Sequence, residues 1–202
     1  MIEVEVHGRG GQGVVITSKI LGTAALYDGN YAQSFPLYGP ARRGAPVVSF
    51  VRIDKHPILL RGYIEHPDIM IILDDSVIET GILNNIKDNC VVIVNTEEKN
   101  IEDIKGVESN LNLNSCYCID GTGLALKHLN KPIPNVVILG FLIKITNIVS
   151  KDSLIEAIRH ELSKYPLDII QKNINGALEA YNSSYSLHNF KSYSLSLKEV
   201  VT

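Results

Sequence analysis

The distribution of apolar and polar residues predicts that the chain begins with a strand, a loop and a helix. Over residues 2–7, Ile and Val alternate with Glu and His, which is the period-two pattern of a strand covered on one face. From residue 14 to residue 26 the apolar side chains lie largely on one helical face, and the turn residues Asp-Gly-Asn follow at 28–30. A second strand is expected over residues 31–35.

Short runs rich in Val and Ile predict the remaining strands, at residues 47–53, 69–73, 91–94 and 116–119. The last three runs are almost wholly apolar, as is typical of strands buried on both faces of a mainly parallel sheet. After Pro134 the apolar pattern becomes helical, over residues 136–148, 154–162 and 169–181. We therefore expect a doubly wound α/β fold, with a mainly parallel sheet, helices on both of its faces and a helical C-terminal third.

Polar residues follow three of the predicted strands, at residues 74–75, 95–96 and 120–122. Open α/β sheets bind ligands along the edge where the carboxyl ends of their strands meet, so these side chains are candidates for a binding site. The same residue types also cap helices and begin turns. The pattern alone leaves both interpretations open.

Composition excludes several classes of function. The 202 residues carry a formal net charge of −3, and the nineteen Lys and Arg residues are scattered along the chain, so no nucleic-acid partner is expected. No apolar run reaches the roughly 18 residues that cross a bilayer, and the chain opens without a basic leader; we expect a cytoplasmic protein without a membrane partner. The cysteines, Cys90, Cys116 and Cys118, lack the spacing of a zinc or iron–sulfur site and are expected to be free thiols.

A glycine-rich motif of the G-x-G-x-x-G type directly follows the first predicted strand and opens the first helix. Glycines allow a tight turn and a close approach of the backbone to an anion, and the free N–H groups of a helix's first turn attract phosphate. An arginine in the motif can add a charge-assisted hydrogen bond. The candidate cofactor-binding residues are therefore Gly8, Arg9, Gly10, Gly11, Gln12 and Gly13.

The motif has two other interpretations. A nicotinamide dehydrogenase requires an acidic residue at the end of its second strand to hold the ribose hydroxyls, but residues 31–35 end in neither Asp nor Glu, and Asp28 precedes this strand. This lack weakens the dehydrogenase hypothesis. The loop could also be only a tight turn that packs the strand against the helix without any ligand.

The glycine loop is one of a long series of motifs in a fixed order. It is followed by residues 33–46 (QSFPLYGPARRGAP), 50–54, 57–58, 66–68, Asp74, 120–122, Asn135, 139–140 and 172–174. Together these motifs resemble the gamma subunit of pyruvate:ferredoxin oxidoreductase and of its relatives that act on branched-chain oxoacids. The resemblance covers residues 1–182, expected to form a single gamma-type catalytic domain, and it leaves residues 183–202 as a C-terminal tail.

The resemblance implies a role within a larger enzyme that oxidatively decarboxylates a 2-oxoacid to acyl-coenzyme A and passes the electrons to ferredoxin. Thiamine diphosphate, magnesium and the iron–sulfur clusters would lie on partner subunits of the alpha, beta and delta types. This chain would bind no cofactor alone and would supply no catalytic residue or metal ligand. It would complete the active-site interface and help to hold coenzyme A. The RRGAP run (residues 42–46) is closer to the pyruvate and branched-chain enzymes than to the 2-oxoglutarate type, although indolepyruvate-type relatives remain an alternative.

The segment 35–46 carries the second candidate site. Its three prolines and two glycines surround two arginines, so we expect a shaped surface loop rather than a helix or strand. Arginines pair with carboxylates or phosphates of a partner, and aromatic rings bury apolar area at interfaces. The candidate interface residues are Phe35, Pro36, Tyr38, Arg42 and Arg43. The alternatives are a solvated loop and, for the whole chain, a self-sufficient nucleotide-dependent dehydrogenase or a non-catalytic assembly protein.

Overall fold

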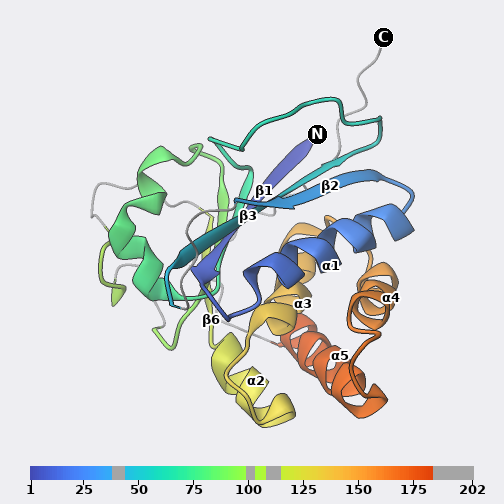
Figure 1. Ribbon diagram of the computed structural model, residues 1–202. Coiled ribbons are helices and arrows are strands. Elements are labelled where there is room, and N and C mark those ends of the chain that lie inside the picture. The colour runs from blue at the N-terminus through green and yellow to red at the C-terminus, as the bar shows by residue number, and fades with distance from the viewer. Residues whose placement is uncertain (38–43, 99–102, 108–114, 184–202) are drawn as a thin grey trace.

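The computed structural model describes residues 1–37, 44–98, 103–107 and 115–183 (Figure 1). Within these residues the elements follow the order expected from the apolar pattern. They are β1 (Ile2–Arg9), α1 (Val14–Tyr27), β2 (Tyr31–Pro36), β3 (Pro46–Asp54), β4 (Ile69–Ile72), the 3₁₀ helices η1 (Asp75–Thr80) and η2 (Ile82–Asn85), β5 (Val91–Asn95), β6 (Cys116–Ile119), α2 (Gly121–Leu129), α3 (Asn135–Thr146), α4 (Lys151–Glu161) and α5 (Leu167–Asn182).

The strands form one mixed sheet in the order β2-β3-β1-β4-β5-β6. Strands β1, β4, β5 and β6 run parallel, whereas β3 is antiparallel to both β1 and β2. From β1 the chain crosses through α1 to β2 at one edge, while β4, β5 and β6 continue toward the other edge. The carboxyl ends of β1 and β4 therefore meet at a topological switch point, where open α/β sheets bind ligands.

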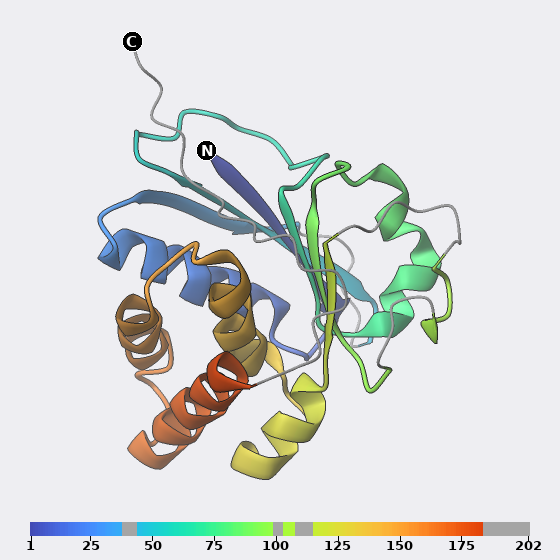
Figure 2. The ribbon, with the colours of Figure 1, turned by 180° about the vertical axis from the view of Figure 1, so that it is seen from behind.

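Helices cover both faces of the sheet, as predicted, but the two covers differ. The α-helices gather on one face, and the 3₁₀ helices η1 and η2 lie on the other (Figures 1 and 2). In β4, Ile69 and Ile71 join the core beneath the α-helices, and Met70 and Ile72 pack into the smaller core beneath η1 and η2. This double burial explains why the sequence of β4 is continuously apolar.

The helical C-terminal third is also confirmed. Helix α3 is buried around almost its whole circumference because α1, α2, α4 and α5 surround it and its Phe141 ring packs against Tyr117 of β6. Helix α2 was not predicted as a separate element, but the capping alternative for Asp120 is correct. The Asp120 carboxylate accepts a hydrogen bond from the Gly123 N–H at 2.6 Å and caps the N-terminus of α2.

The expected loop over residues 35–46 is shorter than predicted. Phe35 and Pro36 belong to β2, where they pair with Phe50 and Ser49 of β3, and Pro46 begins β3. Proline is tolerated here because β2 lies at the edge of the sheet, where the missing N–H breaks no ladder. The predictions for Tyr38, Arg42 and Arg43, and for the tail beyond residue 183, concern positions outside the described residues.

The three cysteines are free thiols, as predicted, and all pack into the core beneath η1 and η2. Removal from water raises the pKa of the Cys90 thiol to about 12, with the Asp68 and Glu5 carboxylates adding to the effect. The same desolvation raises the pKa of Cys118 to about 11 and also raises that of Cys116. These thiols are therefore protonated and poorly nucleophilic at neutral pH.

No helix in the described part of the chain combines the length and the apolar character needed to cross a lipid bilayer.

Candidate functional site

The glycine loop turns sharply between the end of β1 and the start of α1. Gly11 and Gly13 have φ angles of +99° and +86°, in the left-handed region that favours glycine. At Gly8 the constraint is space, because a Cβ would lie 2.9 Å from Val14 Cγ2 and 3.2 Å from Leu73 Cβ. The glycines thus hold the loop close against the end of β4 and allow its backbone to turn sharply at Gly11 and Gly13.

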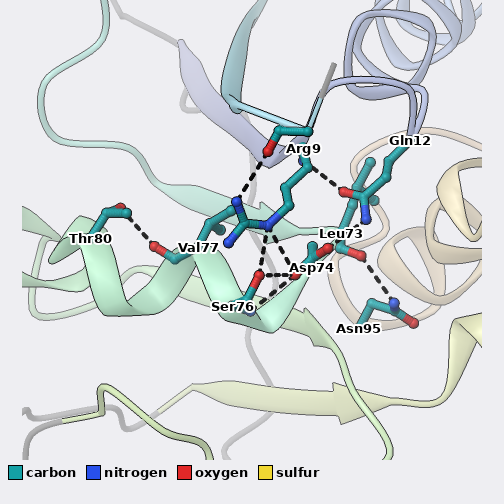
Figure 3. Close-up of polar contacts among 9 residues, drawn as sticks. Arg9, Gln12, Leu73, Asp74, Ser76, Val77, Thr80 and Asn95 are labelled. Atoms are coloured by element: carbon teal, nitrogen blue, oxygen red, sulfur yellow. Dashed lines mark hydrogen bonds and ion pairs between the residues drawn. The ribbon is translucent and has the colours of Figure 1, made fainter. Parts of the chain in front are cut away.

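A polar network anchors this loop to the end of β4 (Figure 3). Arg9 Nε donates a hydrogen bond to Ser76 Oγ at 2.8 Å and lies 3.8 Å from Asp74 Oδ1, and Arg9 Nη1 donates to the Gly44 carbonyl at 3.1 Å. Gln12 Nε2 donates to Asp74 Oδ2 at 2.6 Å. The guanidinium of Arg9 is therefore engaged with its own chain, and its main contribution here is to fix the loop.

Asp74 is held as a carboxylate by this network. Its partial burial would raise its pKa, but hydrogen bonds from Ser76 and Gln12, and the charge of Arg9, outweigh that effect and lower the pKa below the usual value for Asp. The network therefore retains a negative charge directly beside the glycine loop.

The N–H groups of the loop fall into two sets. Those of Arg9, Gly10 and Gln12 already donate, to Gln12 Oε1 at 2.6 Å, the Ala45 carbonyl at 2.9 Å and the Arg9 carbonyl at 3.1 Å. Those of Gly11 and Gly13 have no hydrogen-bond acceptor among the residues that the structure describes, and neither have the N–H groups of residues 14–16 in the first turn of α1. An anion would therefore be bound at the Gly11 and Gly13 side of the loop.

The glycine loop and the arginine-containing segment, separate features of the sequence, form one hydrogen-bonded unit. The Gly10 N–H donates to the Ala45 carbonyl, and the Gly44 N–H donates to the Gly10 carbonyl at 3.3 Å. Arg9 adds its bond to the Gly44 carbonyl. Gly44 and Ala45, where the described part of the chain resumes, are thus fixed directly beside the glycine loop.

The aromatic part of the candidate interface lies on the face of the sheet opposite the α-helices. The rings of Phe35 and Phe50 are 5.3 Å apart, that of Tyr63 follows 5.5 Å from Phe50, and the Arg52 guanidinium lies 5.4 Å from the Phe35 ring centre. Tyr63 keeps 60% of its surface exposed, and Leu59, four residues earlier in the chain, keeps 87%. This part of the surface is apolar enough to suit a protein contact.

The polar residues that follow β4, β5 and β6 converge at the carboxyl edge of the sheet, as predicted. Asn95 Nδ2 donates to the Leu73 carbonyl at 3.0 Å (Figure 3). It also donates to Thr122 Oγ1 at 2.9 Å, while Asn95 Oδ1 accepts from the Thr122 N–H. The polar residues at the ends of these three strands border a cavity of about 550 Å³. Its lining carries five carboxylates, those of Asp74, Asp75, Glu97, Glu98 and Asp120. An anionic ligand would be repelled from this cavity.

Comparison with known proteins decides the family. The family model for pyruvate ferredoxin/flavodoxin oxidoreductases matches residues 3–183. The chain belongs to this family. The resemblance to gamma subunits inferred from the sequence is thereby confirmed, and the mixed sheet with its helical C-terminal third is the fold of such subunits.

Individual relatives support the same assignment. The chain is 42% identical over 188 residues to the pyruvate/ketoisovalerate oxidoreductases common subunit gamma of Thermococcus kodakarensis, covering 91% of this chain and 97% of the relative. It is 40% identical over 182 residues to the pyruvate synthase subunit PorC of Methanothermobacter thermautotrophicus, covering 90% and 94% of the two chains. The family members that it resembles are thus subunits of similar length.

Solved structures agree. The pyruvate oxidoreductase subunit PORC of Thermotoga maritima superposes with a TM-score of 0.76 at 30% identity, covering 89% of this chain and 94% of that chain. A 2-oxoglutarate:ferredoxin oxidoreductase of Magnetococcus marinus shares the fold, with a TM-score of 0.77 at 17% identity; the match covers 96% of this chain and 33% of that longer chain.

Proposed function

We propose that this chain is the gamma subunit of a pyruvate or related 2-oxoacid:ferredoxin oxidoreductase and is inactive outside the assembled enzyme. The enzyme would oxidatively decarboxylate the 2-oxoacid to acyl-coenzyme A, with ferredoxin as the electron acceptor. Alpha-, beta- and delta-type subunits would supply thiamine diphosphate, magnesium and the iron–sulfur clusters. The gamma chain would complete the interface around their active site.

The observation that carries this proposal is the hydrogen-bonded union of the glycine loop with Gly44 and Ala45. Gly44 and Ala45, which end the segment suited to contact a partner, are thereby held beside the loop suited to approach an anion, at the switch point of the sheet. A partner subunit that docks on the segment would close over the loop. This arrangement favours a shared active-site boundary over a self-sufficient dehydrogenase site.

Within that boundary we propose that Gly11 and Gly13 approach a phosphate group of coenzyme A. Their N–H groups lack acceptors among the described residues and lie at the positive end of the α1 dipole, so this side of the loop fits a phosphate. Coenzyme A would serve as the acceptor of the acyl group. The contribution of this chain would be to bind and orient the phosphate, while Arg9, Gln12 and Asp74 keep the loop rigid.

Reconstitution tests the subunit role. The purified chain alone should not reduce a dye in the presence of oxoacid and coenzyme A, and mixing it with the other subunits should restore dye reduction that requires both compounds. Appreciable turnover by the chain alone would refute the proposal, and so would full activity of the other subunits without it.

A charge variant tests the coenzyme A role. Ile16 borders the Gly11 and Gly13 side of the loop, and Ile16→Glu places a carboxylate there at a helix position that tolerates acidic residues. In the assembled enzyme it should raise the apparent KM for coenzyme A about tenfold while leaving the KM for the oxoacid within about twofold. Val15→Glu, one residue earlier and outside that lining, is the matched control. Equal KM values for coenzyme A in the two variants would contradict the role.

A further inference from the structure

A second cavity, of about 520 Å³, opens on the Gly11 and Gly13 side of the glycine loop. It is lined by the loop, the first turn of α1, the α2–α3 connection and α5. Helices α1, α2, α3 and α5 lie on one side of the sheet (Figures 1 and 2). Its lining is mostly apolar, including Ile16, Leu129 and Ile133, and it contains no acidic side chain. In this respect it is the opposite of the carboxylate-lined cavity on the Gln12 side.

A buried amide faces this cavity without a partner. Asn135, the first residue of α3, is 6% exposed and lines the cavity, and its side chain packs directly against Gly13. The Asn135 amide makes no hydrogen bond within the described residues. Within the described residues, Ser115 Oγ is the one wholly buried side-chain polar atom without a partner. The amide of Asn135 is therefore open to the cavity, where it can bond a group that enters.

A second buried asparagine repeats this feature on the opposite wall. Asn173 of α5 is 7% exposed, and its Nδ2 donates to the Ile169 carbonyl at 2.8 Å, which leaves its Oδ1 without a donor among the residues described. The cavity thus presents unpaired amide groups from α3 and α5, which are far apart in the sequence. Pockets for small molecules are typically apolar with a few such polar groups.

The charge of the lining selects the ligand. Lys131 supplies the only ionisable ammonium or carboxylate among the lining residues, and the N–H groups of Gly11 and Gly13 add the positive end of α1. Both favour an anion. The volume that remains is bounded by apolar side chains and suits a short hydrocarbon chain.

We propose that this cavity binds a small molecule that combines one anionic group, a phosphate monoester or a carboxylate, with a short apolar body. The anion lies against Lys131, Asn135 and the Gly11 and Gly13 N–H groups, and the apolar body fills the space toward α5. The inference rests on the proposed role of the glycine loop as an anion site and extends it to a ligand that the isolated subunit holds by itself.

Calorimetric titration of the full chain tests this proposal, with butyl phosphate, hexanoate, butanol and inorganic phosphate as probes. Saturable binding of butyl phosphate identifies the phosphate class, and saturable binding of hexanoate identifies the carboxylate class. Butanol should not bind, because it lacks the charge, and inorganic phosphate should bind about tenfold more weakly, because it lacks the apolar body. Failure of both amphiphilic anions to bind at millimolar concentration would overturn the proposal.

Two variants locate the site. Asn135→Asp changes the amide to a carboxylate of the same shape and should weaken binding of the favoured probe at least about tenfold, since it repels the anion. Lys131→Gln removes the cation from the rim and should weaken binding about threefold to tenfold even if the buried variant proves unstable. The matched controls are Asn175→Asp, at an exposed position of α5, and Lys19→Gln, on the exposed side of α1. Unchanged affinity in Lys131→Gln would refute the proposed location.

The outcome is separable from that of the coenzyme A test. Anion binding by the isolated chain, together with normal coenzyme A kinetics of the Ile16→Glu enzyme, would support the cavity and refute the coenzyme A role. Absence of binding would refute the cavity even if the KM for coenzyme A rose.

Discussion

The contact between α3 and α5 offers a sharp test of the packing, because the two helices approach closely enough to exclude a single methyl group. At Gly140 of α3, a Cβ would overlap the Ala177 carbonyl oxygen and would lie 2.6 Å from the Ala177 carbonyl carbon and 2.8 Å from its Cα. These are backbone atoms of α5, so rotation of a side chain cannot relieve the overlap. Gly140→Ala must separate the two helices or distort one of them.

The expected loss follows from two opposing effects. Overpacking a core costs about 1–3 kcal/mol where neighbours can adjust, and a backbone obstacle places this variant at about 3 kcal/mol. Alanine recovers about 1 kcal/mol through its higher helix propensity. The net loss is about 2 kcal/mol, and because 1 kcal/mol shifts Tm by about 2–4 °C in a protein of this size, we expect Tm to fall by about 4–8 °C.

The matched control is Gly176→Ala, which makes the same substitution in the partner helix α5. Its Cβ would lie 3.1 Å from Val137 Cγ2, a side-chain methyl that can move by a few tenths of an ångström. The propensity gain of about 1 kcal/mol then prevails, and Tm should stay unchanged or rise by about 2–4 °C. Thermal unfolding followed by circular dichroism measures both variants. If Gly140→Ala proved as stable as Gly176→Ala, the close helix approach would be wrong.

Three further predictions concern the site, the thiols and the interface. The lowered pKa of Asp74 means that its carboxylate stabilises the native state above about pH 4 and that this contribution is lost as pH falls. Asp74→Asn should therefore be less stable than the parent protein at pH 7. The difference in the free energy of unfolding between the two proteins, measured by urea titration, should shrink below about pH 4. Cys90 and Cys118, with pKa values of about 12 and about 11, should resist iodoacetamide at pH 8 (about the pKa of a free thiol) until urea unfolds the chain, as followed by mass spectrometry. Changing both Arg42 and Arg43 to alanine should weaken co-purification with partner subunits while leaving Tm unchanged; undiminished assembly would identify a solvated loop.

The sequence predicts the strands well because burial on both faces leaves a plain signature. Residues 91–94 are all apolar, so this short run does not show the alternation of apolar and polar faces that an amphipathic helix would have. The strand predicted there is confirmed as β5, which runs over Val91–Asn95. Helix α2 was harder to predict because its nine residues include two glycines, which lower intrinsic helix propensity. Its start is fixed by the Asp120 cap and by the Asn95–Thr122 bonds, and those bonds reach 27 residues along the chain.

The candidate site could be predicted only in part from the sequence, because the residues that complete it lie far from the glycine loop along the chain. The glycine pattern correctly indicates a tight turn before a helix, but it does not say on which side of the loop the free N–H groups lie. Two residues outside the loop decide which side can bind an anion. The Ala45 carbonyl accepts the hydrogen bond of the Gly10 N–H, and the Asp74 carboxylate makes the Gln12 side of the loop acidic. Asn135 lines the cavity on the remaining side of the loop. It stands more than 120 residues after the loop, and its place in the series of family motifs does not show that it packs against Gly13. A glycine motif therefore specifies where an anion could bind only after the residues that compete for its N–H groups have been placed.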